Sequence, residues 1–246
     1  MPDRVDLSGH AALVTGAGRR LGQAFAMALA ERGAAIAAHY GASEEGAVEV
    51  VSMAKAGGAA AAALQADLAE PAQAAALVDR AAAALGFVDI LVNSASVFEE
   101  GGMLETDLGA WERHLKVNLT APFLLSQAFA RHRAGGPGVI VNLLDWRALR
   151  PGADHFAYTV SKAALASMTR SLALSLAPAI RVNGLALGAI LPAAGQGADS
   201  GEVLERVPAG RWGTVEEAVE ALLFLVAGSE FVTGAILHLD GGRHIG

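Results

Sequence analysis

Cysteine is absent from the 246 residues of this chain. Its absence excludes structural disulfides and metal sites built on thiolates, and is typical of a protein kept in a reducing compartment. The chain also lacks an N-terminal apolar segment of the signal-peptide kind, and no uncharged apolar stretch reaches about 18 residues, as a membrane span requires. We therefore expect a cytoplasmic protein that does not enter membranes.

Charge is scarce as well. Only 17% of the residues are charged, the formal net charge is −7, and Lys and Arg form no run. A nucleic-acid-binding surface needs clustered positive charge, so nucleic acid is not an expected partner. The 53% of hydrophobic residues can bury a sizeable core and argues against a disordered chain. No linker rich in proline, glycine and serine divides the sequence, so we expect one domain over residues 1–246.

Short apolar segments alternate with longer helical patterns along the chain. Segments that are apolar throughout are expected where helices cover both faces of a sheet. This order predicts an α/β fold, with a single Rossmann-type doubly wound parallel sheet of about seven strands and helices on both faces. The expected strands are residues 10–15, 34–40, 60–66, 88–93, 138–144, 180–186 and 235–240, and the expected helices are residues 20–32, 44–56, 71–85, 108–133, 155–177 and 214–227. Residues 191–213 show no clear period and are expected to form a loop with one short helix, either a lid or a plain surface excursion.

A glycine-rich turn, TGAGRRLG, follows the first expected strand and begins at Thr15. Glycine permits a tight turn and lets backbone N–H groups approach a phosphate, and the N-terminus of the following helix favours the same anion. Its place after the first strand of an alternating chain predicts a dinucleotide site. The expected contacts are Gly16, Arg19, Arg20, Leu21 and Gly22, with Arg20 at a position where many such turns carry glycine.

The end of the second expected strand indicates which dinucleotide binds. NAD-selective sites usually place a carboxylate there to hold the ribose 2′-hydroxyl, and its charge repels a 2′-phosphate. Here His39, Tyr40 and Ser43 are the expected contacts, and the first acid is Glu44. With two arginines in the neighbouring turn this pattern favours NADP(H), the alternative being that both arginines are only solvated. After the third strand, Asp67 is expected to accept a hydrogen bond from the adenine amino group, or else to begin the next helix.

Tyr158 and Lys162 stand four residues apart, a spacing that puts both side chains on one face of a helix. A phenol has a pKa of about 10, and a fixed cation beside it favours the phenolate and lowers that pKa. The pair can therefore exchange a proton with a substrate. Taken alone it is also an ordinary pair of helix-surface residues.

The motifs occur in an order that resembles the short-chain dehydrogenase/reductase family. The ordered set is TGAGRRLG, Asp67-Leu68, Asn93-Ser94-Ala95-Ser96, Asn118, Tyr158-x-x-x-Lys162 and Arg181-Val182-Asn183-Gly184, and it runs from about Gly9 to the C-terminal LDGG. The resemblance implies a Rossmann-type domain, a nicotinamide cofactor and commonly a homotetramer. It also implies that Tyr158 donates the proton and that Lys162 supports it and holds the nicotinamide ribose. Asn118 would hold a water or a backbone kink behind Lys162, the alternative being a buried structural amide. The further cofactor contacts that it implies are Asp67, Leu68, Asn93, Ser94, Ala95 and Gly188.

Three departures from the usual pattern resemble the pteridine reductase and dihydromonapterin reductase branch. Asp145 stands in place of a serine, Arg20 in place of a glycine, and the segment NSAS followed by Val97-Phe98 in place of NNAG. The likeness implies that Arg20 lies by the cofactor phosphates and the pterin, that Phe98 stacks on the pterin and that Asp145 contacts its nitrogens, with Ser96 also at the substrate. Two further departures bear on the 2′-phosphate grip and the nicotinamide pocket: Ala42 replaces a basic residue, and Leu187 replaces the proline before Gly188.

The acid at position 145 changes the expected chemistry. A serine donates to a carbonyl at any pH, whereas an ionised carboxylate only accepts hydrogen bonds. Beside a nitrogen heterocycle the acid is a good partner, and if burial raises its pKa it can protonate a ring nitrogen as a C=N bond is reduced. The expected function is NADPH-dependent reduction of a dihydropterin-like heterocycle by Asn118, Asp145, Tyr158 and Lys162.

Two alternatives remain open at this point. One is a carbonyl or 3-oxoacyl reductase, or an alcohol dehydrogenase, of the same family, in which the acid is a tolerated loss of the serine. The other is a non-catalytic dinucleotide-binding sensor. The seven histidines show no metal-ligand spacing joined to acids or cysteines, so no metal is expected.

Overall fold

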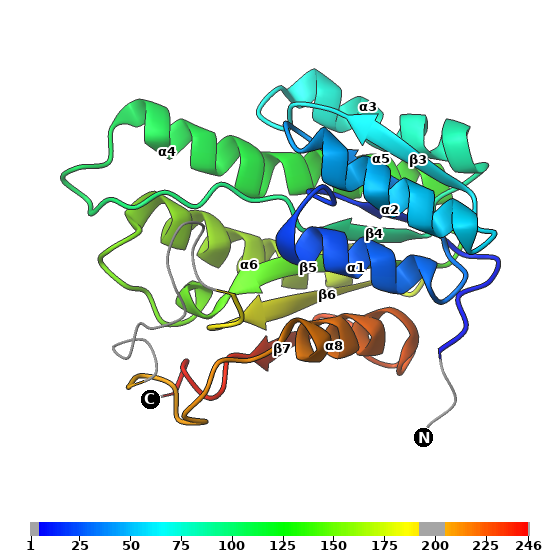
Figure 1. Ribbon diagram of the computed structural model, residues 1–246. Coiled ribbons are helices and arrows are strands. Elements are labelled where there is room, and N and C mark those ends of the chain that lie inside the picture. The colour runs from blue at the N-terminus through cyan, green and yellow to red at the C-terminus, as the bar shows by residue number, and fades with distance from the viewer. Residues whose placement is uncertain (1–4, 192–204, 246) are drawn as a thin grey trace.

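All seven strands of the sheet run parallel, in the order β3-β2-β1-β4-β5-β6-β7. This arrangement, seen in a computed structural model that describes residues 5–191 and 205–245, confirms the predicted α/β doubly wound fold (Figure 1). The strands are β1 (Ala11–Val14), β2 (Ala35–Tyr40), β3 (Ala61–Gln65), β4 (Ile90–Asn93), β5 (Gly138–Asp145), β6 (Ile180–Leu187) and β7 (Ile236–Leu239). Parallel neighbours need a crossover between them, and helices supply it here.

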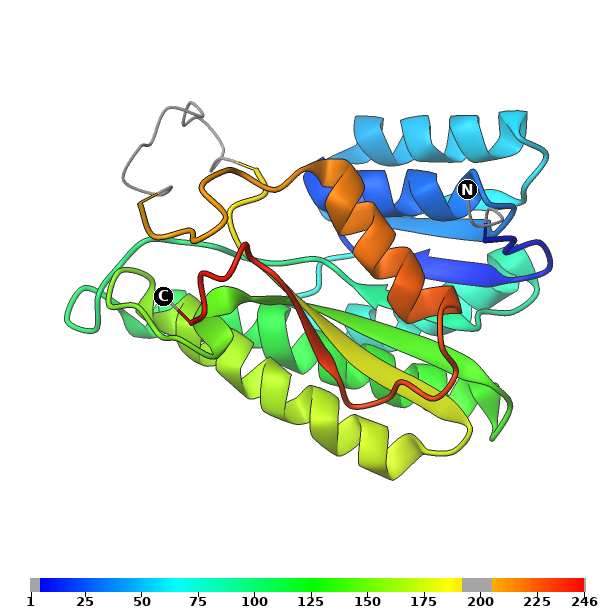
Figure 2. The ribbon, with the colours of Figure 1, turned by 90° about the horizontal axis from the view of Figure 1, so that it is seen from below.

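Two layers of helices enclose the sheet, as Figures 1 and 2 show. One face is covered by α1 (Arg20–Ala30), α2 (Glu44–Ala56) and α8 (Val215–Ala227), and the other by α3 (Pro71–Leu85), α5 (Ala121–Arg133) and α6 (Phe156–Leu176). Successive strand residues point to opposite faces. Ala12 and Val14 accordingly join the first core cluster, whereas Leu13 joins the second. Helices cover both faces of the sheet, which explains why most strand positions are apolar.

The helix expected over residues 108–133 is interrupted in the structure. It consists of α4 (Leu108–Leu115), a π-helical turn (Lys116–Thr120) and α5. Asn118 lies in the π turn, with its amide bonded outside the helix. A π turn of this kind widens a helix locally and is frequent at functional sites. The prediction of one unbroken helix was therefore wrong at this point.

The remaining helices lie within one or two residues of their predicted positions, apart from any element in residues 192–204. Those residues lie outside the described part of the chain, so the loop expected over residues 191–213 stays a prediction. Among the described helices, none combines the length and the apolar character that crossing a bilayer demands. Because all the strands point the same way, their carboxyl ends meet at one edge of the sheet, where ligands of open α/β sheets bind.

Candidate active site

The turn after β1 is fastened to the segment that follows β4. The Oγ1 of Thr15 accepts hydrogen bonds from the backbone N–H groups of Ser94 (2.9 Å) and Ala95 (3.0 Å). Gly16 has φ +68°, and a Cβ built on it would lie 3.0 Å from the Cα of Ala95. Only glycine meets both demands at this position. The fold thus brings three of the predicted cofactor residues, Gly16, Ser94 and Ala95, into direct contact.

Close backbone approach continues along the same turn. A Cβ on Gly22 would collide with the carbonyl of Gly16, and one on Gly18 with the carbonyl of Ser43 at the start of α2. The Ser43 side chain makes no capping bond to its own helix. The result is a narrow cradle of backbone at the N-terminus of α1, the arrangement that suits a phosphate group. The glycines therefore fit a dinucleotide.

The His39 side chain holds the glycine-rich turn in position through hydrogen bonds. Its Nδ1 accepts a hydrogen bond from the backbone N–H of Gly16 (3.1 Å), and its Nε2 lies 3.1 Å from the carbonyl oxygen of Ala66, to which it donates. Burial lowers the pKa of His39 to about 4, so the ring is neutral at physiological pH. Because both ring nitrogens are used, His39 positions the turn and offers no polar side-chain atom to a dinucleotide.

Arg19 and Arg20 lie exposed at the start of α1. Arg19 is the extended N-cap residue of the helix, whereas Arg20 holds a left-handed backbone with φ +53°. That conformation is costly for any residue with a Cβ, which explains why glycine is common at this point of such turns. Leu21 and Tyr40, also predicted contacts, are half-buried.

Asp67 is exposed at the end of the third strand, and its Oδ1 accepts from the backbone N–H of Ala69 (2.9 Å). The N-cap residue of α3 is Glu70, so the alternative that Asp67 begins this helix was wrong. Contact with an adenine stays a prediction. The neighbouring Leu68 is buried in the core, and Gly188 packs so closely on Asp240 that a Cβ would lie 2.6 Å from the Cα of that residue.

Asp145, Tyr158 and Lys162 meet at the carboxyl end of β5. The Tyr158 hydroxyl donates to Oδ2 of Asp145 (3.2 Å), and the backbone N–H of Arg147 donates to Oδ1 (2.9 Å). The Lys162 ammonium donates to the carbonyl oxygen of Leu143 (2.7 Å) and lies 5.7 Å from the centre of the Tyr158 ring. Three of the four predicted catalytic side chains thus lie close together, and Tyr158 and Lys162 are buried.

Burial decides how these groups titrate. It raises the pKa of Asp145, which favours the protonated carboxyl. Burial and the neighbouring Asp145 carboxylate also raise the pKa of Tyr158 well above its ordinary value, so the phenol stays protonated. Burial lowers the pKa of Lys162 to about 8. The expectation that Lys162 lowers the pKa of Tyr158 is not met here, because the ammonium faces the ring and a carbonyl rather than the hydroxyl.

Asn118 clamps the segment that leads to Phe98. Its Oδ1 accepts from the backbone N–H of Val97 (2.8 Å) and from Ser96 Oγ (3.1 Å). Its Nδ2 donates to the Val97 carbonyl (2.9 Å) and to Ser161 Oγ (3.0 Å). The amide therefore joins the segment after β4 to α6, one residue before Lys162, and the π turn frees it to do so.

Asn93 faces inward. Its Nδ2 donates to Oδ1 of Asn142 (2.8 Å), whose own Nδ2 donates to Thr169 Oγ1 (3.0 Å). This buried polar chain ties β4, β5 and α6 together. Asn142 and Thr169 were missed in the sequence, where single polar residues inside apolar segments were the available signal.

Phe98 is half-exposed at the site, with its ring already in contact with a second ring. His155 stacks on it (centroids 4.2 Å apart, 15° between planes), and Tyr158 meets it edge-on at 4.6 Å. A flat substrate has to use the other face of Phe98 or displace His155.

A series of close contacts connects Asp145 with the imidazole of His155. The Nη2 of Arg147 pairs with Asp154 (2.6 Å), Asp154 contacts His155 (3.0 Å), and the Nη1 of Arg147 is 3.9 Å from Asp145. Asp154 and His155 were missed in the sequence analysis because only the fold brings them beside Phe98.

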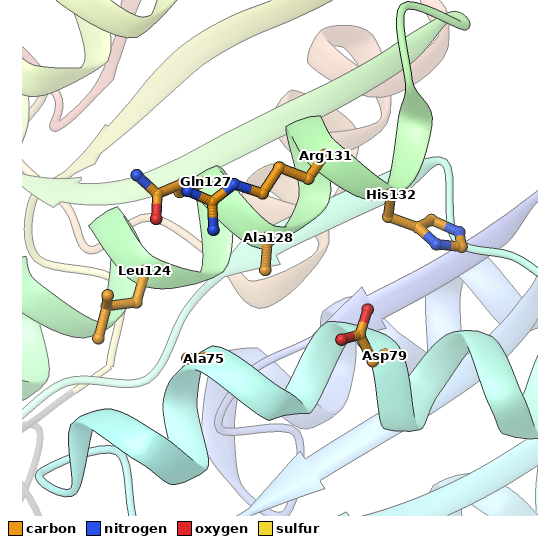
Figure 3. A pocket seen from close by; sticks show the side chains of 7 residues that line it. All are labelled: Ala75, Asp79, Leu124, Gln127, Ala128, Arg131 and His132. Atoms are coloured by element: carbon orange, nitrogen blue, oxygen red, sulfur yellow. The ribbon is translucent and has the colours of Figure 1, made fainter.

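Neither of two surface hollows coincides with this group. The larger, of about 300 Å³, lies between α3 and α5 and is lined by Asp79 on one helix and by Gln127, Arg131 and His132 on the other (Figure 3). It contains none of the predicted site residues. A smaller hollow of about 180 Å³ lies beyond β6 and β7, beside Ala189 and Asp240.

Comparisons with known proteins match nearly the whole chain. A family profile described as enoyl-(acyl carrier protein) reductase matches residues 16–244. The cis-4-hydroxycyclohexanecarboxylate dehydrogenase of Sinomonas cyclohexanicum is 40% identical over 238 residues, which cover 94% of this chain and 95% of that protein.

Two solved structures are similar over almost their full length. A blue fluorescent protein from a metagenomic library, solved with NADPH, has a TM-score of 0.90 and 37% identity and covers 97% of this chain and 99% of its own. FolM alternative dihydrofolate reductase 1 from Brucella canis, solved with NADP, has a TM-score of 0.92 and 32% identity and covers 98% and 96%. Both were solved with the phosphorylated nicotinamide dinucleotide.

Proposed function

We propose that this chain, which belongs to the short-chain dehydrogenase/reductase family, reduces a dihydropterin-like C=N heterocycle with NADPH. Membership makes it an oxidoreductase that uses a nicotinamide dinucleotide. The retained Tyr158 and Lys162 speak against the alternative of a non-catalytic sensor. The choice of substrate and of NADPH over NADH is the proposal.

The carboxyl group of Asp145 carries the proposal. It lies at the position where the usual serine hydroxyl would activate a carbonyl. It is hydrogen-bonded to Tyr158 and largely shielded from solvent. A buried carboxyl with a raised pKa can donate to an unprotonated ring nitrogen, and when ionised it can accept from ring N–H and amino groups. An aliphatic ketone offers only a hydrogen-bond acceptor, so it does not make full use of a carboxyl group that can both donate and accept hydrogen bonds.

The bound NADPH supplies the hydride in this chemistry. Protein groups manage the proton and the position of the substrate. The protonated Tyr158 phenol, or Asp145 bonded to it, donates the proton to the reduced nitrogen. Lys162 is the cation next to both, and Asn118 fixes the segment that carries Phe98.

The preference for NADPH rests on the residues after β2. The strand ends at Tyr40, and no carboxylate stands before Glu44. Arg19 and Arg20 lie exposed across the turn, where a 2′-phosphate would gain a positive partner. Structural relatives solved with NADPH and NADP support the same choice. Comparing kcat/KM for the two cofactors tests it, and equal values would oppose it.

Replacing Asp145 by Asn and by Ser separates the substrate classes. With a dihydropterin and NADPH, Asp145→Asn is expected to lower kcat/KM by at least about 100-fold, the usual contribution of a positioned acid. Asp145→Ser restores the hydroxyl that suits ketones, so it should lose pterin reduction and keep or gain ketone reduction. Tyr158→Phe serves as the inactive control in both assays. A wild-type protein that reduces ketones but no pterin would refute the proposal.

A second candidate is oxidation of a hydroxy acid or reduction of the matching keto acid. The 40% identity to a hydroxycyclohexanecarboxylate dehydrogenase favours it. So does the guanidinium of Arg147, whose Nη1 lies 3.9 Å from Asp145 and could hold a substrate carboxylate. NADP⁺ and NAD⁺ reduction with cyclic hydroxy acids, run beside the pterin assay, decides between the two.

We also propose that the protein is a homotetramer, as is common in the family. The long, alanine-rich segments 108–133 and 155–177 are suited to close packing between subunits, and they expose the apolar side chains of Leu108 on α4, Phe123 on α5 and Leu174 on α6. Covering them would remove apolar surface from water.

A further inference from the structure

Strand β7 and the turn after it bring two histidines and an aspartate together. His238 lies in β7, and Asp240 directly follows Leu239, the last residue of that strand. The turn folds back through Gly241 and Gly242, whose φ angles are +61° and +86°, and this places His244 beside them. One ligand atom from each of the three side chains lies within 4.8 Å of the other two.

The carboxylate of Asp240 builds the turn. It is buried and accepts hydrogen bonds from the backbone N–H groups of Gly242 (3.0 Å) and His244 (2.9 Å). It also contacts Nδ1 of His244 at 2.8 Å. A carboxylate that orients an imidazole in this way is a common feature of metal sites.

These hydrogen bonds do not explain why the imidazole of His238 lies in the cluster. The rings of His238 and His244 stack with centroids 3.9 Å apart, yet Nδ1 of His238 is buried without a hydrogen-bond partner. Buried polar atoms normally have a partner in the protein, a water or an ion. A simple His–Asp pair accounts for Asp240 and His244 but leaves this nitrogen without a role.

We propose that His238, Asp240 and His244 bind a divalent transition-metal ion of the zinc type. Two imidazole nitrogens and one carboxylate oxygen suit Zn²⁺, Co²⁺ or Ni²⁺, whereas Mg²⁺ and Ca²⁺ prefer oxygen ligands alone. With bonds of about 2.0 Å, ligand atoms in a tetrahedral site are about 3.3 Å apart. An imidazole binds a metal in the plane of its ring, so the two stacked rings have to turn out of their stack before a nitrogen of each can point at one ion, and a water completes the set.

The ion would act as a structural clasp, away from the reacting atoms. Between the ligands, Arg243 lays its guanidinium over Trp146 (4.2 Å to the ring centre), and its carbonyl accepts from Arg150 (3.3 Å). Trp146 directly follows Asp145 in the chain. Fixing the C-terminal turn therefore also fixes one wall of the candidate active site.

Titration of tag-free, chelator-treated protein with Co²⁺ and Zn²⁺ tests the proposal. We expect one equivalent of Co²⁺ to give the visible bands of a low-coordinate nitrogen and oxygen site, and one equivalent of Zn²⁺ to displace it. His238→Ala and His244→Gln are each expected to weaken binding at least about tenfold. Zn²⁺ should raise the melting temperature of the wild type but not that of these two variants.

His10→Ala is the matched control, because His10 also pairs with an aspartate, Asp89, at 2.7 Å but has no second histidine. It should bind one equivalent as the wild type does. Circular dichroism identifies any variant that fails to fold, and His244→Gln keeps a polar side chain in the turn. Equal affinity in wild type and in folded His238 and His244 variants, or no binding at micromolar Zn²⁺, would overturn the proposal. The outcome does not depend on which substrate the enzyme uses.

Discussion

Arg20 holds a left-handed backbone conformation where glycine is the easiest residue to accommodate. The Cβ makes this conformation cost about 1 to 2 kcal/mol. We therefore expect the free energy of unfolding of Arg20→Gly to exceed that of Arg20→Ala by about 1 kcal/mol, after the greater freedom of glycine in the unfolded chain is allowed for. If the side chain contacts cofactor phosphates, the same change should weaken NADPH binding. Urea unfolding and a fluorescence titration with NADPH measure the two effects.

Arg20→Ala is the control for this prediction. It removes the guanidinium and keeps the Cβ, so it should weaken NADPH binding without the gain in stability. If both variants were equally stable, the backbone at position 20 would not be under strain.

Lys162 makes stability depend on pH. Its pKa is about 8 in the folded protein and 10.5 in the reference state, so between these values only the unfolded chain binds the proton. Stability therefore rises with pH across this window and is level below about pH 8, where both states bind the proton. Relative to Lys162→Met, the wild type should gain about 2 kcal/mol between pH 8 and pH 10, since one pKa unit corresponds to about 1.4 kcal/mol. Chemical unfolding at several pH values measures the difference.

Lys116→Met serves as the comparison, because Lys116 is exposed on the π turn. The stability difference between that variant and the wild type should not change over the same pH range. A flat difference for Lys162→Met as well would mean that the ammonium is not desolvated.

At the residue scale, the sequence predicted which groups would meet but not how they would titrate. The order of motifs and the spacing of Tyr158 and Lys162 correctly indicated that both would lie near Asp145. The pKa of the phenol depends on depth and on the orientation of the ammonium, which faces the carbonyl of Leu143. The spacing of residues along a helix reveals neither the depth of burial nor the orientation of the ammonium. The stack of His155 on Phe98 was hidden for the same reason.

The π turn around Asn118 is the element that departs most from expectation. Asn118→Leu removes an amide with four hydrogen bonds and leaves both backbone groups of Val97 without these partners. Each buried polar group left unsatisfied costs about 1 to 3 kcal/mol, so we expect a loss of about 2 to 4 kcal/mol in unfolding free energy. Because Val97 precedes Phe98, KM for the substrate should also rise. Denaturant unfolding and steady-state kinetics record both.

Gln127→Leu provides a matched amide-to-leucine change on α5, outside the π turn. It should alter stability and KM little. If Asn118→Leu behaved like this control, the amide would not be what holds the segment.

The other elements were predictable for identifiable reasons. Strands that are buried on both faces are apolar at most positions, and the cores on the two sides of β1 show this. The start of α8 could be seen in Thr214 and Glu217, which form a capping box. The π turn could not, because the side chains around it keep a helical pattern while one backbone turn widens.

At the scale of the whole molecule, assembly is the open prediction. Leu174 is 85% exposed on α6. Placing a charge there would put an unpaired carboxylate into an apolar contact between subunits, so Leu174→Glu should convert the tetramer into smaller species. Light scattering coupled to size exclusion measures the mass. A monomeric wild type would contradict the expected assembly.

Val48→Glu is the control for assembly. Val48 is also an exposed apolar residue, but on α2, which is not one of the helices expected at the interface. That variant should keep the mass of the wild type.

The sheet as a whole was predictable, but its C-terminal turn was not. Alternation of strands and helices is enough to predict a doubly wound sheet. The meeting of His238, Asp240 and His244 depends on two left-handed glycines that reverse the chain, and their spacing matches no familiar ligand motif. Residues that a tight turn brings together are hardly revealed by the periodicity of the sequence.

The two parts of the candidate site, the turn after β1 and the surroundings of Asp145, differ in whether backbone or side chains form them. Backbone and glycine form the cradle after β1, whereas side chains, namely Phe98, Arg147 and His155, surround Asp145. An inhibitor that fills only the cradle would meet surfaces that many related enzymes share. A compound that inserts between Phe98 and His155 would contact side chains rather than backbone, so selective chemical probes should be sought there.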